Sequence, residues 1–151
     1  MIERTLVLLK PDAVQRGLVG KIIGRLEERG LKILGLKLMQ MDADLAKRHY
    51  AEHIDKPFFP GLSGFMMSGP IVAVAIGGKN AVEVVRATMG TTNPLNAAPG
   101  TIRGDFGVDI GRNLIHGSDS PESAERELGI FFGGTEILDW SYDQDRWTIE
   151  S

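Results

Sequence analysis

Apolar and polar positions along this chain follow two periods, which predict an ordered series of strands and helices. The apolar run at residues 5–9 ends at Lys10-Pro11-Asp12. It predicts a buried first strand, because proline cannot continue a ladder in a central strand. Apolar residues at 18, 22, 23 and 26 recur at helical spacing, and Gly30 follows them. This pattern predicts an amphipathic helix over 18–29 that ends at a left-handed glycine cap.

The middle of the chain predicts two more strands. Leu34, Leu36 and Leu38 alternate with less apolar positions, which indicates a strand within 31–41. Asp42 or Asp44 then caps a helix to about residue 53, residues 56–61 break it, and a helical turn covers 62–67. Residues 70–76 are continuously apolar, as in a central strand covered on both faces.

The last third completes the predicted fold. Residues 80–83 resemble a capping box that opens a helix ending at Gly90, and residues 91–112 read as one long loop. A short buried strand at 114–115 runs into His116, and Ser120-Pro121 starts a helix to about 129. This order predicts an α/β sandwich, with a ferredoxin-like βαββαβ core, an antiparallel sheet and flanking helices. We expect one domain over 1–151.

Composition narrows the function classes. The chain has 151 residues, 42% of them hydrophobic and 25% charged, which is typical of a globular protein. Its formal net charge of −3 gives no overall positive field that would attract a polyanion such as DNA. Any phosphate site must therefore be formed by a local group of residues. No cysteine is present for a disulfide or a thiolate metal cluster. No signal peptide or membrane-length run stands out, so we expect a cytoplasmic protein that binds no membrane and no specific nucleic acid.

Several common motifs are absent. Residues 17–22 contain a Gly-Lys pair but lack the rest of a Walker A loop, and no G-x-G-x-x-G follows a strand. No G-x-S-x-G nucleophile elbow is present. His49 and His53 have the spacing of zinc ligands on one helical face, but a third ligand is not evident. The pattern favours two histidines on a partly exposed helix.

The most informative stretch is residues 113–119, where His116 ends an apolar run and polar side chains surround it. Such a histidine is either a nucleophile or an ordinary hydrogen-bonded, partly buried residue. Glu127, in the next predicted helix, could accept the N–H of one ring nitrogen and leave the other free to attack, with Ser118 joining the chain. The pattern alone favours a charged helix face for Glu127.

Cationic and aromatic residues indicate a second candidate function, which is the binding of phosphates and of a base. Arg86 and Arg103 could together hold a polyphosphate through bidentate contacts, or both could be solvated. Lys10 and Thr92 add donors at the ends of elements. Tyr50 is either a core residue or a hydroxyl that reaches phosphate. Phe58, beside Phe59, is either satellite core or a base-stacking platform.

Residues 113–120, Asn-Leu-Ile-His-Gly-Ser-Asp-Ser, resemble the active-site signature of the nucleoside diphosphate kinase family. The resemblance covers most of the chain. It runs from residues 4–6 and 10–12 through 58–59, Arg86, 92–94 and 99–105 to about Trp140.

The resemblance implies a ping-pong exchange in which a nucleoside triphosphate phosphorylates His116 and a diphosphate such as GDP then removes the phosphoryl group. Glu127 would orient His116, with support from Ser118. The positions that match phosphate-holding residues are Lys10, Tyr50, Arg86, Thr92 and Arg103. Lys10 and Asn113 also match ribose contacts, Phe58 and Ile110 match the two sides of the base slot, and Leu62 lies nearby. Mg²⁺ would arrive on the nucleotide phosphates, with Asp119 reaching it through water.

Two features depart from the family pattern, and two other functions compete. Ile110 stands where the family often has valine, and residues 141–151 carry no family pattern. The resemblance implies a homo-oligomer, a dimer, tetramer or hexamer. A nucleotide- or RNA-binding ferredoxin-like module without transferase activity is the main alternative, although the predicted strands lack surface aromatics. A hydrolase that passes the phosphohistidine to water is the other.

Overall fold

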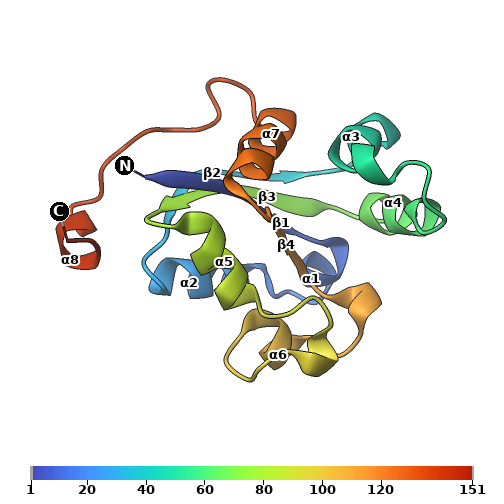
Figure 1. The fold of residues 1–151 in the computed structure, drawn as a ribbon, viewed down its shortest axis with the longest axis horizontal. Coiled ribbons are helices and arrows are strands. Elements are labelled where there is room, and N and C mark those ends of the chain that lie inside the picture. Colours follow the sequence, from blue (N-terminus) through green and yellow to red (C-terminus); the bar gives the residue numbers. More distant parts are fainter. Residues whose placement is uncertain (1, 151) are drawn as a thin grey trace.

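The computed structural model describes residues 2–150, and its centre is a four-stranded antiparallel sheet (Figure 1). The strands lie in the order β2-β3-β1-β4, which is that of a ferredoxin-like βαββαβ core. Their bounds are Glu3–Leu9 for β1, Lys32–Met39 for β2, Ile71–Gly78 for β3 and Ile115–Gly117 for β4. The predicted fold class is confirmed. β1 lies between β3 and β4, and Leu8 pairs with His116 across the β1–β4 ladder.

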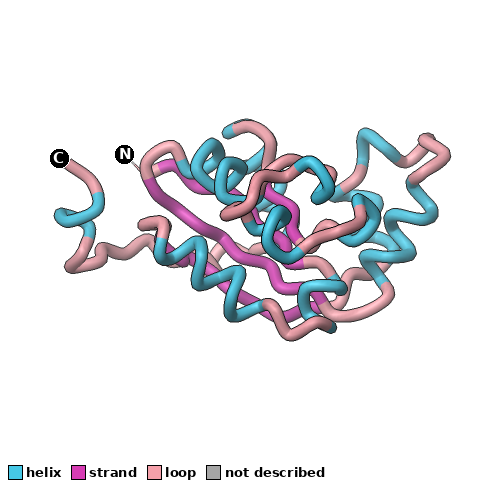
Figure 2. Tube along the Cα trace, turned by 90° about the horizontal axis from the view of Figure 1, so that it is seen from below, coloured by secondary structure: helices cyan, strands magenta, loops and turns pink. Residues whose placement is uncertain are grey.

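Helices cover both faces of the sheet and make two core layers (Figures 1 and 2). Helices α2 (Val19–Glu28) and α5 (Ala81–Met89) pack on the face that carries Val7 and Leu9. The other face, with Leu6 and Leu8, is covered by α3 (Ala43–His49), α4 (Phe59–Met67) and α7 (Pro121–Phe131). Because both faces are covered, every residue of β3 is buried, as its continuous apolar sequence predicts.

Most predicted helix ends are confirmed by their caps. Gly30 has φ of 101°, its N–H donates to Glu27, and the N–H of Leu31 donates to Leu26, which is a Schellman motif. Asp42, rather than Asp44, caps α3, and Ser120 caps α7. These caps fix where α3 and α7 begin, and both helices carry side chains to the site described below.

The predicted capping box at Asn80 is wrong. Asn80 adopts the left-handed conformation, with φ of 55°, and its side chain makes no cap hydrogen bond. Glu3 supplies the acceptor instead, since its Oε1 takes the N–H of Val82 at 2.8 Å. A distant strand therefore satisfies the start of α5, which a local motif cannot reveal.

The helix predicted to run through His53 ends at His49. Tyr50 follows, and then a 3₁₀ turn, η1, over Ala51–His53. His49 and His53 therefore do not share a helical face. His49 is buried, with its ring 5.1 Å from that of Phe131, whereas His53 lies beside Phe58. Helix α4 also starts before the predicted residue 62, at Phe59.

Residues 91–112 are not one structureless loop. They contain η2 (Pro94–Asn96), α6 (Ile102–Phe106) and η3 (Ile110–Arg112). Thr101 caps α6 by accepting the N–H of Gly104. A further short helix, α1 (Pro11–Gln15), follows β1 directly. Elements of three to five residues are too short to show a hydrophobic period, so the sequence does not predict them.

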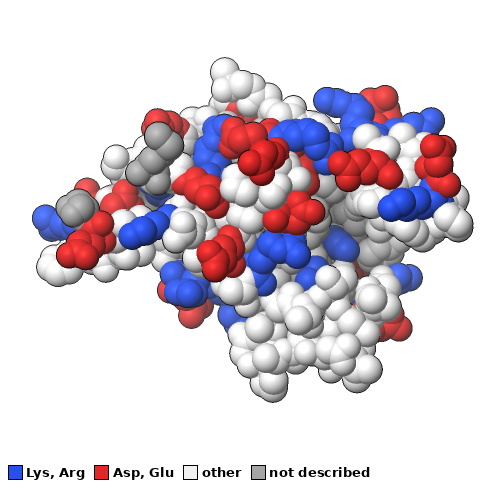
Figure 3. Space-filling model, viewed as in Figure 1, with Lys and Arg blue, Asp and Glu red and all other residues white. Residues whose placement is uncertain are grey.

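The chain after α7 runs beside β2. Leu138 donates its N–H to the carbonyl of Leu34, the indole of Trp140 donates to Ile33, and Lys32 Nζ donates to the carbonyl of Trp140. The short helix α8 (Asp145–Thr148) follows. Among the residues described, none of the helices has the length and apolarity needed to span a membrane. Acidic and basic side chains are interspersed over much of the face drawn in Figure 3.

Candidate active site

A cavity of about 340 Å³ lies beside the end of β4 and brings together most of the predicted site residues. Those predicted residues are Lys10, Tyr50, Phe58, Leu62, Arg86, Thr92, Arg103, Asn113, His116, Asp119 and Glu127. Ser118 does not line the cavity, since it is buried behind Glu127. Ile110 is 56% exposed on η3 and is not among the lining residues. The cavity therefore joins segments that lie far apart in the sequence.

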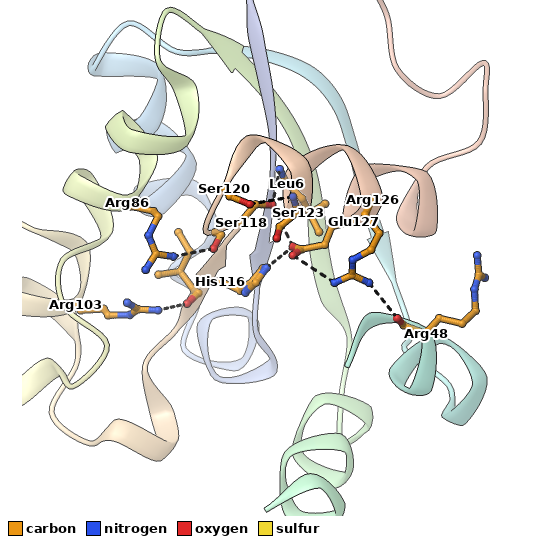
Figure 4. Close-up of polar contacts among 12 residues, drawn as sticks. Leu6, Arg48, Arg86, Arg103, His116, Ser118, Ser120, Ser123, Arg126 and Glu127 are labelled. Atoms are coloured by element: carbon orange, nitrogen blue, oxygen red, sulfur yellow. Dashed lines mark hydrogen bonds and ion pairs between the residues drawn. The ribbon is translucent and has the colours of Figure 1, made fainter. Parts of the chain in front are cut away.

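His116 is oriented by a carboxylate, as Figure 4 shows. Its Nε2 lies 2.6 Å from Glu127 Oε1. An ionised carboxylate only accepts hydrogen bonds, so Nε2 carries the hydrogen, and Nδ1 has a free lone pair whenever the ring is neutral. Burial alone would raise the pKa of Glu127, but the hydrogen bond and charge of His116, with smaller contributions that include Ser118, hold that pKa below its ordinary value. The ring thus has one fixed and one free nitrogen.

Ser118 holds the carboxylate from behind. Its hydroxyl donates to Glu127 Oε1 at 3.1 Å. The serine backbone N–H donates to the carbonyl of Leu6 at 3.2 Å, and the N–H of Leu6 donates to Ser118 Oγ at 3.4 Å. Because β1 fixes Ser118 and Ser118 fixes Glu127, the sheet determines the orientation of the imidazole.

The two predicted arginines differ in burial. Arg103 is only 6% exposed and donates to the carbonyls of Gly90, Asn113 and Ile115, so the solvated alternative is wrong for this residue. Burial, and then the charge of Arg86, lowers the pKa of Arg103 to about 10, and it stays charged at neutral pH. Arg86 is exposed on α5 and donates to the carbonyl of Gly117 at 3.2 Å. Both guanidinium groups therefore lie beside the strand of His116.

A lysine and an amide that line the cavity are linked by a hydrogen bond. Lys10 Nζ donates to Asn113 Oδ1 at 2.8 Å, and Asn113 Nδ2 donates to the carbonyl of Thr92 at 3.1 Å. Burial, and then the charge of Arg103, lowers the pKa of Lys10 to about 8. The ammonium is thus partly removed from water beside the cavity, and an anion bound there would favour its charged form.

Aromatic side chains complete the rim. Phe58 is 52% exposed, with the ring of His53 at 5.4 Å and Lys56 Nζ at 5.8 Å from its centroid. Burial, and then the charge of Glu127, raises the pKa of Tyr50, which keeps its hydroxyl protonated. An exposed aromatic ring at the cavity mouth provides a flat apolar surface for a ligand.

Of the lining residues that were not predicted as site residues, two lie beside His116 and Glu127. His49 lies with its ring 5.0 Å from that of His116, and Arg126 Nη2 lies 3.9 Å from Glu127 Oε2. Burial, and then the charge of His116, lowers the pKa of His49 to about 3, so it is neutral. The adjacency of Arg126 to Glu127 is a sequence signal for the arginine. For His49, the zinc-like spacing indicated His53 as its neighbour, whereas the structure places His49 beside His116.

His49, His116 and Glu127 could in principle hold a metal ion, since one ligand atom of each lies within 4.8 Å of the others. Two of these three residues, His116 and Glu127, are already joined by a hydrogen bond. Basic side chains also line the cavity, namely Lys10, Arg86, Arg103 and Arg126. Their positive charges oppose a cation bound without an anionic ligand. The cavity suits an anion better than a resident metal.

Gly117 provides a test of how α5 supports β4. Its φ is not in the left-handed region, so the glycine is needed for close packing rather than for a turn. A Cβ at this position would lie 2.6 Å from Met89 Sδ and 3.0 Å from Val85 Cγ1. We expect Gly117→Ala to lower the free energy of unfolding by about 1–3 kcal/mol, measured by chemical denaturation.

The matched control is Gly129→Ala, because a Cβ at Gly129 meets nothing within 4 Å. Alanine in the interior of α7 should leave the free energy of unfolding unchanged or raise it. Equal losses in the two variants would show that contact with α5 does not explain the glycine at 117.

A histidine with one free ring nitrogen, in a cavity that ammonium and guanidinium groups also line, is an arrangement suited to phosphoryl transfer. Comparison with known proteins gives the same class. A model of the family described as nucleoside diphosphate kinase matches residues 3–137. A curated nucleoside diphosphate kinase from Chloroflexus aurantiacus is 62% identical over 151 residues, with 99% of this chain and 100% of that protein covered.

A nucleoside diphosphate kinase from Archaeoglobus fulgidus is 56% identical over 149 residues, with 99% of each chain covered. The structure of a halophilic nucleoside diphosphate kinase from Halobacterium salinarum in complex with CDP has a TM-score of 0.96 and 53% identity to this chain. It covers 99% of this chain and 100% of its own. This chain belongs to the nucleoside diphosphate kinase family. Its reaction is the transfer of the terminal phosphoryl group from a nucleoside triphosphate to a nucleoside diphosphate, through a phosphohistidine.

Proposed function

We propose that His116 is the residue that carries the phosphoryl group, and that Nδ1 is the attacking atom. The hydrogen bond between Nε2 and Glu127 is the observation that supports this assignment. The Nδ1 lone pair forms a bond to the γ-phosphorus, and the bond from that phosphorus to the β,γ-bridging oxygen breaks, so a nucleoside diphosphate leaves. A second diphosphate attacks the phosphohistidine in the reverse sense, and Nδ1 regains its lone pair.

We propose that the basic side chains bind the phosphates. Arg103 uses three N–H groups on backbone carbonyls and has two more for a ligand, while Arg86 lies beside the same strand. Lys10, Thr92 and Tyr50 add donors from the other walls. Groups fixed in this way need little reorganisation when charge develops in the transition state.

We propose that the nucleoside lies beside the exposed residues of the cavity rim. Lys10 and Asn113 would contact the ribose hydroxyls. The base would stack on Phe58, and Ile110 would close the opposite side, with Leu62 nearby. The exposure of Phe58 and Ile110, together with the CDP complex of the Halobacterium salinarum relative, supports this assignment. Stacking tolerates any base because every base has a π-face, so we expect broad base specificity.

We propose that Mg²⁺ enters with the nucleotide and has no dedicated protein ligands. The cationic lining of the cavity disfavours a free cation but accepts one neutralised by phosphates. Asp119 is exposed and lines the cavity, where its carboxylate could reach such an ion through water. Bound Mg²⁺ would neutralise part of the negative charge of the phosphates.

The remaining expectations concern the whole protein. We propose that residues 1–151 form one kinase domain that works in the cytoplasm and assembles as a homo-oligomer. Leu36 and Leu38 support assembly, because they are 51% and 67% exposed on the edge strand β2. Light scattering on the purified protein would give the number of subunits, and a monomer at working concentration would contradict this part of the proposal.

The function is tested by incubation with γ-labelled ATP and Mg²⁺, followed by a chase with GDP. We expect an acid-labile, base-stable phosphoprotein that is discharged by GDP to give labelled GTP. Release of free phosphate without dependence on GDP would favour the hydrolase instead. High-affinity RNA binding without a phosphoenzyme would favour the binding module.

We expect Lys10 to make kcat/KM for nucleotides depend on pH. With a pKa of about 8, Lys10 is mostly protonated at pH 7 and mostly neutral at pH 9. Because the charged form binds phosphate, we expect kcat/KM for nucleotides to fall about tenfold between pH 7 and pH 9, with a midpoint near 8. Lys10→Gln should have a lower kcat/KM that is nearly constant over this range. A wild-type profile as flat as that of the variant would exclude Lys10 as the titrating group.

A further inference from the structure

The chain turns sharply just before the strand that carries His116. Leu114 is fully buried and has φ of 73°. The N–H of Ile115 donates to the carbonyl of Asn113 at 2.8 Å, two residues back. A positive φ with this hydrogen bond defines the rare, strained form of the γ-turn. Leucine has no polar side chain to support the left-handed region, so the surrounding structure must hold it there.

The segment Lys10–Asp12 holds this turn from one side. The N–H of Leu114 donates to Asp12 Oδ2 at 3.0 Å, and the N–H of Lys10 donates to the carbonyl of Leu114 at 2.9 Å. Asp12 is buried, with 8% exposure, and Leu114 is the one hydrogen-bond partner of its carboxylate among residues 2–150. Both polar backbone groups of Leu114 are thereby bound to a single short segment.

Arg103 holds the turn from the other side. Its Nε donates to the carbonyl of Asn113 at 3.1 Å and its Nη2 to that of Ile115 at 2.6 Å. The residues on either side of Leu114 are thus fixed by one guanidinium group, while Asp12 fixes Leu114 itself. Three consecutive peptide units have hydrogen-bond partners that keep the turn in place.

The turn determines which side chains reach the cavity. Residues three apart in an extended strand point to opposite faces of a sheet. Asn113 and His116 are three apart, yet both line the same cavity. The γ-turn at Leu114 lies between them, so Asn113 and His116 are not part of one extended strand.

We propose that Asp12 is a positioning residue for phosphoryl transfer, which holds the Leu114 γ-turn and so places His116 relative to the bound nucleotide. This inference rests on the proposed role of His116. Without the Asp12 carboxylate, the N–H of Leu114 is buried without a partner, and the strained turn loses the contact that opposes its relaxation. The His116 ring then leaves its line of attack.

The first test compares Asp12→Ala with Asp12→Asn. We expect Asp12→Ala to phosphorylate His116 about 100-fold more slowly in a single turnover, since a displacement of about 1 Å has an effect of that size. Its dissociation constant for ADP should change less than about fivefold, because the phosphate-binding side chains remain. Asp12→Asn keeps an acceptor oxygen and should retain most of the wild-type rate.

The second test isolates the backbone conformation. In the Asp12→Ala background, Leu114→Gly and Leu114→Ala remove nearly the same side chain, but only glycine adopts a positive φ without strain. We expect the glycine double variant to phosphorylate at least about tenfold faster than the alanine one, because the turn no longer needs support. With Asp12 intact, the two substitutions should differ less.

Three outcomes separate the possibilities. If Asp12→Ala phosphorylates at the wild-type rate and only melts earlier, Asp12 merely stabilises α1 and the proposal is overturned. Equal rates for the two double variants would overturn the part played by the γ-turn. Should Asp12→Ala not fold, Asp12→Ser, with a side chain shorter by one bond, replaces it. Absence of label on wild-type His116 would instead contradict the proposed function, before any variant is compared.

Discussion

His116→Ala is expected to abolish formation of the phosphoenzyme and to lower the rate of phosphoryl exchange at least about 10⁴-fold, because no other group in the cavity combines a free lone pair with this orientation. The measurement is the labelling reaction with γ-labelled ATP, followed by transfer to GDP. The variant should still bind ADP, since the basic and aromatic side chains of the cavity remain.

The matched control is His53→Ala. His53 lies at the cavity rim against Phe58, so its removal should weaken nucleotide binding slightly and leave labelling intact. Labelling of the His116→Ala variant at the wild-type rate would mean that the phosphoryl group is carried elsewhere. A folded His116→Ala protein, confirmed by circular dichroism, is required for this comparison.

Glu127→Ala is expected to have the second largest effect, a fall in kcat of about 10²- to 10³-fold. It removes the acceptor that holds the hydrogen of His116 on Nε2, and it leaves the hydroxyl of Ser118 without that partner. The imidazole then populates the tautomer with hydrogen on Nδ1, which has no lone pair for attack. Single-turnover phosphorylation measures the loss directly.

Glu127→Gln separates orientation from charge. The amide oxygen still accepts a hydrogen bond from Nε2–H, so this variant should lose less activity than Glu127→Ala. It lacks the negative charge that stabilises a positive imidazole during transfer, so it should not match the wild type. If Glu127→Ala transferred phosphate as fast as the wild type, the carboxylate would have no part in activating His116.

Patterns that are local in sequence predicted most of the fold. The continuous apolar run of β3 identified a strand covered on both faces, and Gly30 and Ser120 identified helix ends. In each case the physical cause lies within a few residues of the signal. The boundaries of α3 were harder, because the helix ends where His49 packs into the core rather than at a breaking residue.

The site residues were predicted through the family resemblance, since their separate patterns left alternatives open. Neither the local patterns nor the family resemblance predicted the features that depend on contacts between distant segments. Arg103 is buried because it binds carbonyls at Gly90, Asn113 and Ile115. Asp12 acts on a residue 102 positions away, and the strained turn at Leu114 leaves no local sequence signal. Such contacts form only when the sheet brings β1 and β4 together.

The central claim is that Nδ1 of His116 accepts the phosphoryl group while Glu127 holds Nε2. The most direct measurement is nuclear magnetic resonance of the phosphoenzyme with ¹⁵N-labelled histidine, together with mass spectrometry to locate the modified residue. We predict a single phosphoryl group, on His116, attached to Nδ1, with Nε2 still protonated. A phosphoryl group on Nε2, or on a residue other than His116, would contradict the account.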